Sequence, residues 1–215
     1  MFSVSLRRAV GYGILPAEVF PLQKRSHIHL ARALAHAAPG FDRRRHRAAF
    51  LLGSVQPDCN PLTYLKGSRS AGCFQGHSFA GARPYLFNRM AHLKQRRRWS
   101  LRHYYTLGKL THYLADAFTA PHNSAFSGGP AAHHRYESEL RRHLTAALAH
   151  PQCILPPVRG CPLPAAAVDA LHRQYLSGEP HIQRDIDYIL RATALLMASC
   201  APAAPQFPSY NTHRG

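Results

Sequence analysis

Acidic residues are scarce in this chain, and their scarcity sets the first limits on its function. There are only 10 Asp and Glu residues against 27 Lys and Arg, which gives a formal net charge of +17. Such an excess of positive charge attracts polyanions: nucleic acid, anionic lipid surfaces or phosphorylated substrates. It does not choose among them. The basic runs RRRHR (43–47) and QRRR (95–98) are expected, by default, to be solvated helix faces.

Long apolar runs and paired cysteines are also missing. No stretch of about 18 apolar residues exists, so no membrane span is expected. Pro16 and Glu18 interrupt the short apolar patch near the N-terminus, which makes it a poor secretory signal and leaves the cytoplasm as the expected location. The five cysteines form no CxxC pair, and their odd number argues against a full disulfide framework. Cys153 and Cys161 could bridge a loop, although free buried thiols are the preferred interpretation.

The remaining composition and patterning predict an all-α fold. With 46% hydrophobic residues in 215, the chain can bury the core of one domain. No repeat and no strand pattern interrupts the helical periodicity. Ser26 and Ser100 are candidate N-caps, and Pro130 suits the first turn of a helix. Helices are expected over residues 26–38, 42–52, 79–95, 100–118, 130–149, 164–176 and 180–199. The expected division is an N-terminal lead (1–25), a single helical domain (26–200) and a flexible tail (201–215).

The run HYLADAFTAPHN (112–123) carries the most informative polar residues. His112 and Asp116 are four residues apart, so a helix projects both from one face. Pro121 stops that helix, and His122 can then turn back over its end. The following helix repeats the spacing with His133 and Glu137. Imidazole nitrogen and carboxylate oxygen are common zinc donors, and helices hold such ligands in fixed directions.

Three residues upstream extend the set. Asp58 lies in a predicted Pro-containing loop just past a helix end, His77 follows a glycine, and His27 lies on the first predicted helix. Each has a simpler interpretation. An isolated His–Asp pair is more often a structural hydrogen bond, Asp58 could be a turn residue or a cap, and His77 could be a surface residue. His29 could also face the core in place of His27. Together, in this order, the five histidines and three carboxylates predict two metal sites and suggest a third.

The motifs SHIHLA, GSVQPD, GH, LGKLTHYLADAFTAPHN and HHRYE, in order over residues 27 to 137, resemble the zinc-dependent phospholipase C family. The likeness is greatest to its compact bacterial members. The resemblance implies a multi-helix bundle with a metal cluster at the base of a cleft, holding two to three Zn²⁺ ions. In secreted members the third ion also binds an N-terminal Trp. This chain departs from that pattern, because its one tryptophan is Trp99. The ligands implied are His77, His112 and Asp116 beside Asp58 for one ion, His122, His133 and Glu137 for the second, and His27 with a bridging Asp116 for the third.

The function implied by the resemblance is hydrolysis of phospholipid head groups by a metal-activated water. Asp58 is then the candidate catalytic base. The expected partners are a phospholipid or other phosphodiester substrate and an anionic membrane surface; nothing in the sequence indicates the oligomeric state.

Two other functions stay open. Single-strand-specific zinc nucleases share the H-x-x-x-D-x-x-x-x-x-H spacing, and the positive charge favours nucleic acid as a substrate. Their last motif resembles N-L-H-x-x-x-D, however, where this chain has H-x-x-x-E. The third interpretation is a metal-stabilised binding module without turnover. The presence of Asp58 speaks against that module, because a closed structural zinc site needs no further carboxylate.

Overall fold

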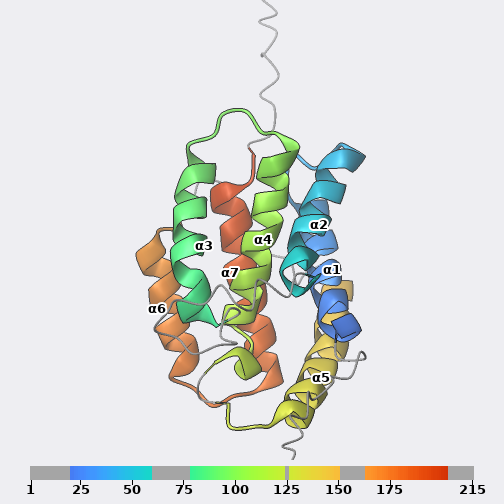
Figure 1. Ribbon diagram of the computed structural model, residues 1–215, viewed down its shortest axis with the longest axis vertical. Coiled ribbons are helices and arrows are strands. Elements are labelled where there is room, and N and C mark those ends of the chain that lie inside the picture. The colour runs from blue at the N-terminus through green and yellow to red at the C-terminus, as the bar shows by residue number, and fades with distance from the viewer. Residues whose placement is uncertain (1–19, 60–77, 124–125, 151–162, 203–215) are drawn as a thin grey trace, which may run out of the picture.

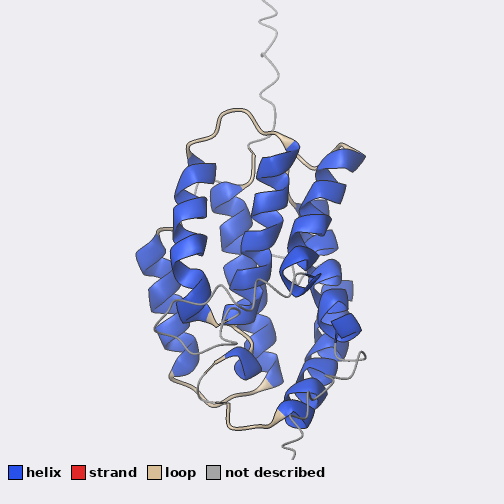
Figure 2. Ribbon diagram, in the orientation of Figure 1, coloured by secondary structure: helices blue, strands red, loops and turns tan. Residues whose placement is uncertain are grey.

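The computed structural model of the chain describes residues 20–59, 78–123, 126–150 and 163–202. Over these residues the fold has seven α-helices, one short 3-10 helix and no strand (Figure 2). The prediction of an all-α fold is confirmed. The elements are α1 (Phe20–Ala37), α2 (Arg44–Cys59), α3 (Phe79–Lys94), α4 (Leu101–Ala117), η2 (Ala120–His122), α5 (Pro130–Ala149), α6 (Ala165–Leu176) and α7 (Ile182–Cys200).

Helix α4 is the central element of the bundle (Figure 1). Apolar residues at intervals of three and four, from Tyr104 through Leu107 and Leu114 to Phe118, bury one stripe along its whole length. Its second half is buried on all sides, because every residue from Leu110 to Ala117 is buried. Helices α2, α3 and α7 pack around it and supply the surrounding surfaces.

Two glycines let α2 and α4 approach each other closely. A Cβ atom at Gly53 would lie 2.0 Å from the carbonyl oxygen of Tyr105. A Cβ atom at Gly108 would lie 2.1 Å from the carbonyl oxygen of Phe50. Neither position can accept a larger residue without movement of backbone, so the glycines fix how α2 crosses α4.

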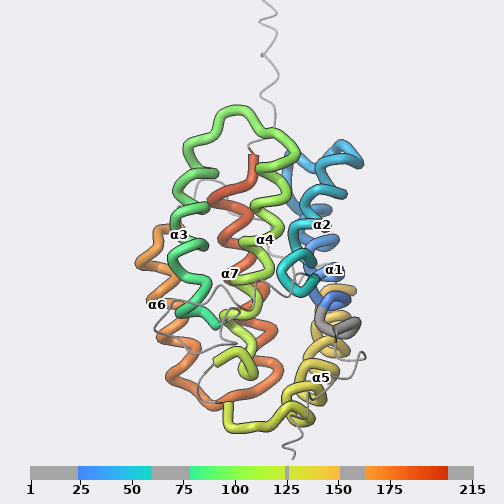
Figure 3. The backbone as a smooth tube through the Cα atoms, in the orientation of Figure 1, coloured from blue at the N-terminus to red at the C-terminus, as the bar shows by residue number. Residues whose placement is uncertain are grey.

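The outer helices complete the bundle in two groups. Helix α5 runs back along α1, far from it in sequence, and also packs against α7 (Figure 3). On the other side, Arg83 of α3 pairs with Asp169 of α6 through contacts of 2.8 and 2.6 Å. Among the helices described, none is both long enough and apolar enough to cross a bilayer.

The helix boundaries agree with the predicted ones except in α1 and α2. Helix α1 begins at Phe20, so Ser26 lies inside it and is not its N-cap. Helix α2 does not stop at Gly53 but continues to Cys59 with Pro57 in its last turn. The predicted end was wrong because packing on α4 keeps this segment helical past both breakers, and a proline in a last turn removes a single helical hydrogen bond.

Some predicted features lie outside the described residues. They are the loop segment beyond Cys59, the pair Cys153 and Cys161, and the tail beyond residue 202. Of the cysteines that are described, Cys59 is exposed, Cys200 is buried, and both are free thiols. Burial raises the pKa of the Cys200 thiol to about 11.

Eight exposed arginines gather at one end of the bundle, which we call the basic end. The α1–α2 turn and the α3–α4 turn meet there around Tyr104, whose hydroxyl donates to the carbonyl oxygen of Gly40 at 2.9 Å. The Tyr104 ring also lies 5.1 Å from Trp99 and stacks on His46. Among the residues of the two turns, 38–47 and 94–103, Asp42 is the one acid. The basic end consists of the exposed residues Arg43, Arg44, Arg45, Arg47, Arg96, Arg97, Arg98 and Arg102.

Candidate metal centre

The second half of α4 carries His112 and Asp116 into the interior of the bundle. The His112 side chain is 0% exposed and that of Asp116 is 5% exposed. Because α4 has no solvent face here, both polar groups must find partners within the protein. Those partners come from α1, α2 and the segment that follows α4.

The ring of His112 is oriented by the backbone of α2. Its Nδ1 donates to the carbonyl oxygen of Ser54 at 2.9 Å. Its Nε2 then faces Oδ1 of Asp58 at 3.5 Å and Oδ2 of Asp116 at 3.2 Å. Burial, together with the nearby His27, lowers the pKa of His112 below its ordinary value. A neutral ring that carries its proton on Nδ1 presents a lone pair at Nε2, which suits a cation held between it and the two carboxylates.

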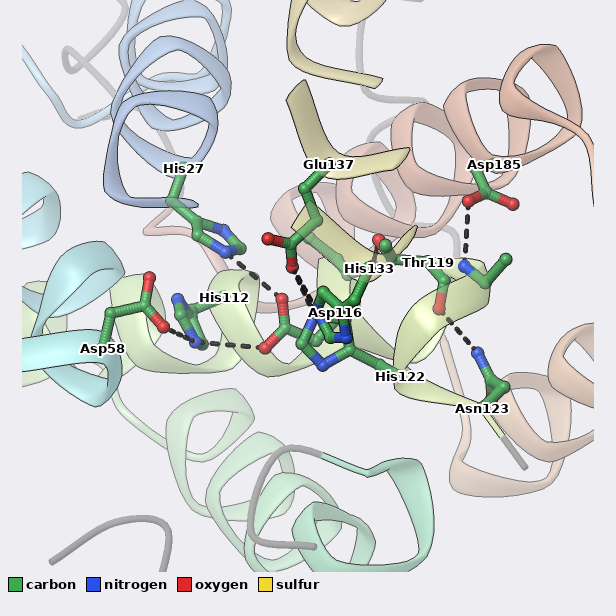
Figure 4. A network of polar contacts seen from close by, with 12 residues as sticks. His27, Asp58, His112, Asp116, Thr119, His122, Asn123, His133, Glu137 and Asp185 are labelled. Carbon is green, nitrogen blue, oxygen red and sulfur yellow. Dashed lines mark hydrogen bonds and ion pairs between the residues drawn. The ribbon is translucent and has the colours of Figure 1, made fainter. Parts of the chain in front are cut away.

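Asp116 lies between two histidines from different helices (Figure 4). Its Oδ1 is 3.2 Å from Nε2 of His27, and its Oδ2 is 3.2 Å from Nε2 of His112. The rings of His27 and His112 are 4.0 Å apart between centroids. Burial acts to raise the pKa of Asp116, but the surrounding His112, His122 and His27 outweigh it and hold that pKa well below the usual range. Asp116 therefore stays ionised and presents one oxygen to each histidine.

Helix α1 directs His27, and not His29, toward this carboxylate. The His27 side chain is 11% exposed and reaches Asp116 from across the pocket. His29 points elsewhere, with its Nδ1 lying 3.2 Å from Oγ1 of Thr145 on α5. The structure thus distinguishes two histidines that the sequence pattern did not separate.

A second group forms where η2 meets α5. The Nε2 atoms of His122 and His133 lie 3.3 and 2.7 Å from the same oxygen, Oε1 of Glu137. Burial acts to raise the pKa of Glu137, but the two histidines outweigh it and lower that pKa to about 2. Burial acts to lower the pKa of His122, but Asp116 and Glu137 raise it to about 9. The two groups are thus electrostatically linked through Asp116 and His122.

The turn that carries His122 is held by its own polar groups. The side-chain amide of Asn123 donates to the carbonyl oxygen of Ala117 at 3.2 Å and to that of Thr119 at 2.9 Å. Figure 4 shows the second of these contacts. Pro121 suits the start of the short 3-10 helix, because its fixed φ matches the helical value and no N–H is needed there. The chain therefore turns sharply after α4 and brings His122 over the end of that helix.

The donor sets and their spacing fit zinc. Two donors that each lie about 2.1 Å from a tetrahedral zinc ion are about 3.4 Å apart. The nitrogen–oxygen distances of 3.2, 3.2 and 3.5 Å around Asp116 and Asp58, and of 3.3 Å between His122 and Glu137, are close to that value. The 2.7 Å between His133 and Glu137 is shorter, as in a direct hydrogen bond, and these two groups would have to separate around an ion. Two sets of three residues place a possible ligand atom each within 4.8 Å of one another: His27, His112 and Asp116, and His122, His133 and Glu137.

A pocket of about 470 Å³, measured out to its open mouth, gives access to both groups. Its polar lining consists mainly of the site residues His27, Asp58, Asp116, His122 and Glu137. One wall is apolar. No arginine or lysine lines the pocket among the residues that the structure describes. The apolar wall is formed mainly by Leu30, Leu140, Leu144 and Ile189.

Seven of the eight candidate site residues come together at this place. His77 lies outside the described residues. Asp58 differs from its predicted setting, because it lies in the last turn of α2 and not in a loop, with its side chain 3% exposed. The packing of α2 on α4, which extended the helix past Gly53, also carries Asp58 to within reach of His112.

One buried acid beside the site was missed by the sequence analysis. Asp185, in the first turn of α7, accepts a hydrogen bond from the backbone N–H of Ala120 at 2.9 Å. His181 stands four residues before it, the same spacing as His112 and Asp116, so the sequence did contain a local signal that was not used. In the structure His181 is the N-cap of α7, and its ring accepts a hydrogen bond from the backbone N–H of Gln183. A second signal that could have found Asp185 is rarity, since the chain has only 10 acidic residues.

Comparison of the sequence with known proteins places the chain in a family. The family model described as zinc dependent phospholipase C matches residues 26–180 of the chain. No curated protein and no solved structure gives a significant match. The matched segment includes every residue of the two groups and ends just before α7.

Proposed function

Because the chain belongs to the zinc-dependent phospholipase C family, we propose that it is a zinc-dependent hydrolase that cleaves the head group from phospholipids. One observation carries this proposal. Asp116 presents its two oxygens to His27 and His112, each 3.2 Å away. A carboxylate shared in this way can bridge two cations, and a pair of cations suits the in-line displacement of a phosphodiester.

We assign the ligands from the two groups. His112 and Asp116 would hold one ion, with His77 as a further ligand, as the family resemblance implies. His122, His133 and Glu137 would hold the second. His27 would bind a third ion through the other oxygen of Asp116, or share the first one, so the count is two to three Zn²⁺. When bound, the ions would neutralise the phosphate oxygens, lower the pKa of a water toward about 7 and stabilise the leaving oxygen.

The residues of the chain would then orient the reactants and move the protons. Asp58 lines the pocket, and its Oδ1 lies 3.5 Å from Nε2 of His112. We assign it as the base that accepts a proton from the attacking water. The new bond forms between the water oxygen and phosphorus, and the bond between phosphorus and the glycerol oxygen breaks. That oxygen takes up a proton, so the products are a diacylglycerol and a phosphorylated head group.

The pocket wall supports a substrate with an apolar part. Leu30, Leu140, Leu144 and Ile189 line the same pocket as the polar site residues and can hold the glycerol end of a lipid out of water. With neither Lys nor Arg among its described lining residues, the pocket itself offers the phosphate no side-chain cation other than the histidines. The ions therefore have to supply most of the positive charge that the substrate meets.

The basic end is separate from the pocket and suggests a second role for the charge. Arg102 at the basic end and Asp116 at the pocket are separated by about 21 Å along α4, at 1.5 Å per residue. Helix α4 runs along the long axis of the bundle, so its two ends are far apart (Figure 1). The eight arginines of the basic end therefore lie away from the pocket. We propose that the basic end binds an anionic membrane surface, with the partly buried Trp99 and the 47% exposed Leu101 as its apolar contacts.

We also propose that one domain extends over residues 26–200, with a lead (1–25) before it and a tail (201–215) after it; the last residues of that lead, from Phe20, already belong to α1. Helix α7 lies beyond the segment matched by the family model, yet it packs on both α4 and α5. Helix α7 therefore belongs to the same hydrophobic core as α4 and α5, to which it contributes the buried Ile186, Ile189 and Leu196.

A single-strand nuclease is the second candidate, and the basic end is the observation that favours it. The apolar side chains of the pocket favour it less, because they suit the glycerol end of a lipid better than a charged sugar–phosphate backbone, although a nucleobase could also contact them. A metal-stabilised binding module without turnover is the third. It is less well supported because Asp58 adds a third carboxylate beside the two groups and lines the open pocket.

The experiment that separates these functions is a substrate panel with zinc-replete protein. It contains phosphatidylcholine, an anionic phospholipid, a soluble phosphodiester reporter and single-stranded DNA. Head-group release that increases when the lipid forms an interface supports the phospholipase. Faster cleavage of DNA, which weakens steeply as salt is added, would assign the chain to the nucleases. Absence of turnover on every substrate would favour the binding module.

A further inference from the structure

Asp185 is a buried carboxylate to which the proposed reaction gives no role. It lies in the first turn of α7, and the residue is 0% exposed. Position 185 is beyond the segment 26–180 that the family model matches. A buried acid is costly unless several donors surround it, so its contacts are expected to be specific.

The two oxygens of Asp185 contact different parts of the fold. Oδ2 accepts from the backbone N–H of Ala120 at 2.9 Å and from the hydroxyl of Tyr136 at 3.0 Å. Oδ1 accepts from the hydroxyl of Tyr175 on α6 at 2.7 Å. Figure 4 shows the first of these contacts, with Asp185 reaching the turn that follows α4.

The partners of Oδ2 are direct neighbours of the second ligand group. Ala120 begins η2, the three-residue helix that ends at His122. Tyr136 immediately precedes Glu137 on α5. One oxygen atom thus links the two backbone segments whose side chains have to converge, and these segments are separated by the 122–133 connection. The partner of Oδ1 belongs to α6, which supplies no ligand.

We propose that Asp185 is a positioning residue of the second metal site, the site of His122, His133 and Glu137, and that it acts through Oδ2. The inference rests on the proposed function, since it concerns zinc at that site. Asp185 does not contact the ion or the substrate. It sets the separation of η2 and α5, and thereby how well His122 and Glu137 meet around one ion. Outer groups of this kind commonly change metal affinity by about 10–100-fold.

Two tyrosines on the same carboxylate provide a matched test. Tyr136→Phe removes the hydroxyl that ties Asp185 to the ligand helix, and Tyr175→Phe removes the one that ties it to α6. Each substitution deletes one oxygen atom and one hydrogen bond to the same acid. A general loss of stability would affect both variants. A positioning role predicts loss of zinc affinity in Tyr136→Phe alone.

Zinc affinity is measured by competition with a chromophoric chelator on the full chain, together with thermal melting of each variant. We expect wild type to bind at least two ions, and Tyr136→Phe to bind one of them about 10-fold more weakly. Tyr175→Phe should keep both affinities within about twofold. Asp185→Asn, which keeps the shape and removes the charge, should weaken the same ion by up to about 100-fold.

A second arm identifies which ion is affected. In a His122→Ala background the second site is already lost, so adding Tyr136→Phe should leave the affinity of the remaining zinc unchanged. Equal zinc affinities in Tyr136→Phe, Tyr175→Phe and wild type would overturn the inference while leaving the proposed function intact. A wild-type chain that binds no zinc would overturn the proposed function itself, and the inference with it. If Asp185→Asn does not fold, the two tyrosine variants still decide the question.

Discussion

The imidazole of His112 and the carbonyl oxygen of Ser54 form a hydrogen bond of 2.9 Å that joins α4 to α2 at the metal centre. Because this bond uses Nδ1, it leaves Nε2 as the ring nitrogen that points at Asp58 and Asp116. It is possible only because α2 and α4 cross closely, and Gly53 and Gly108 are what let them do so. The orientation of His112 at the metal centre therefore depends on the close packing of α2 against α4.

The first prediction concerns that contact. Gly108→Ala would place a Cβ atom 2.1 Å from the carbonyl oxygen of Phe50 and 2.8 Å from the backbone nitrogen of Ser54. Helix α2 has to move away, at a cost of about 1–3 kcal/mol or more. We expect a lower melting temperature and weaker zinc binding, because the His112–Ser54 bond is stretched.

Gly129→Ala is the control for this substitution. A Cβ atom at Gly129 would meet nothing within 4 Å, so only the small change expected at a helix N-cap should follow, at most about 1 kcal/mol. If Gly108→Ala melted and bound zinc like Gly129→Ala, close packing of α2 on α4 would not be what holds the site.

The second prediction concerns the contribution of zinc to stability. If the ions bind only the folded chain, a chelator should lower the free energy of unfolding by about 2.7 kcal/mol for each site that had been held at 100 times its dissociation constant. His112→Ala should lower the zinc content and the melting temperature together, and chelation should then have less effect. The matched control is His143→Ala, which removes an exposed histidine of α5. Identical melting curves with and without chelator would contradict this prediction.

Local spacing predicted the parts of the site that lie on one helix. His112 with Asp116 and His133 with Glu137 are each separated by one helical turn, and the period of the helix alone puts each pair on a common face. Pro121 likewise predicted the turn that brings His122 over the end of α4. These features depend on few residues close together in the chain, so the sequence contains the information.

Contacts between distant segments could not be predicted in the same way. The choice between His27 and His29 depends on how α1 sits between α4 and α5, because Asp116 and Thr145 select one ring each. Gly53 and Pro57 looked like the end of a helix, and the packing of α2 on α4 overrode them. The contacts of Asp185 could not be predicted because its partners, Ala120, Tyr136 and Tyr175, come from three different segments.

The third prediction separates catalysis from metal binding. Asp58→Asn keeps the size and polarity of the side chain and removes its charge and basicity. If Asp58 accepts the proton of the attacking water, turnover should fall by about 10²–10⁴-fold, the usual contribution of general acid–base catalysis. Zinc content should fall much less than in His112→Ala. Asp187→Asn, an exposed acid on α7, is the control. Loss of zinc in parallel with activity would instead identify Asp58 as a ligand.

The fourth prediction concerns the basic end. Replacing Arg96, Arg97 and Arg98 with serine should weaken binding to vesicles that contain phosphatidylserine by about 10–100-fold, because each exposed cation adds to the attraction of an anionic surface. Binding to phosphatidylcholine vesicles and hydrolysis of a soluble phosphodiester should not change, since the pocket is about 21 Å away along α4.

The control for the basic end is a second triple variant with the same change of charge. Serine at Arg142, Arg173 and Arg191, which are exposed on α5, α6 and α7, should leave vesicle binding nearly as in wild type. Equal losses in the two triple variants would mean that net charge, and not the basic end, attracts the surface. A loss of affinity for single-stranded DNA but not for anionic vesicles would assign the basic end to nucleic acid.

The most direct test of the metal centre is the number of zinc ions bound per chain. The measurement is elemental analysis of protein purified without chelator and supplied with zinc, then freed of unbound metal. The seven proposed ligands, six of which the structure brings together beside Asp58, predict two to three ions per chain in wild type and fewer in His112→Ala and His122→Ala. A reproducible value near zero in zinc-supplied wild type would show that these histidines and carboxylates are ordinary interior groups, and would contradict the account.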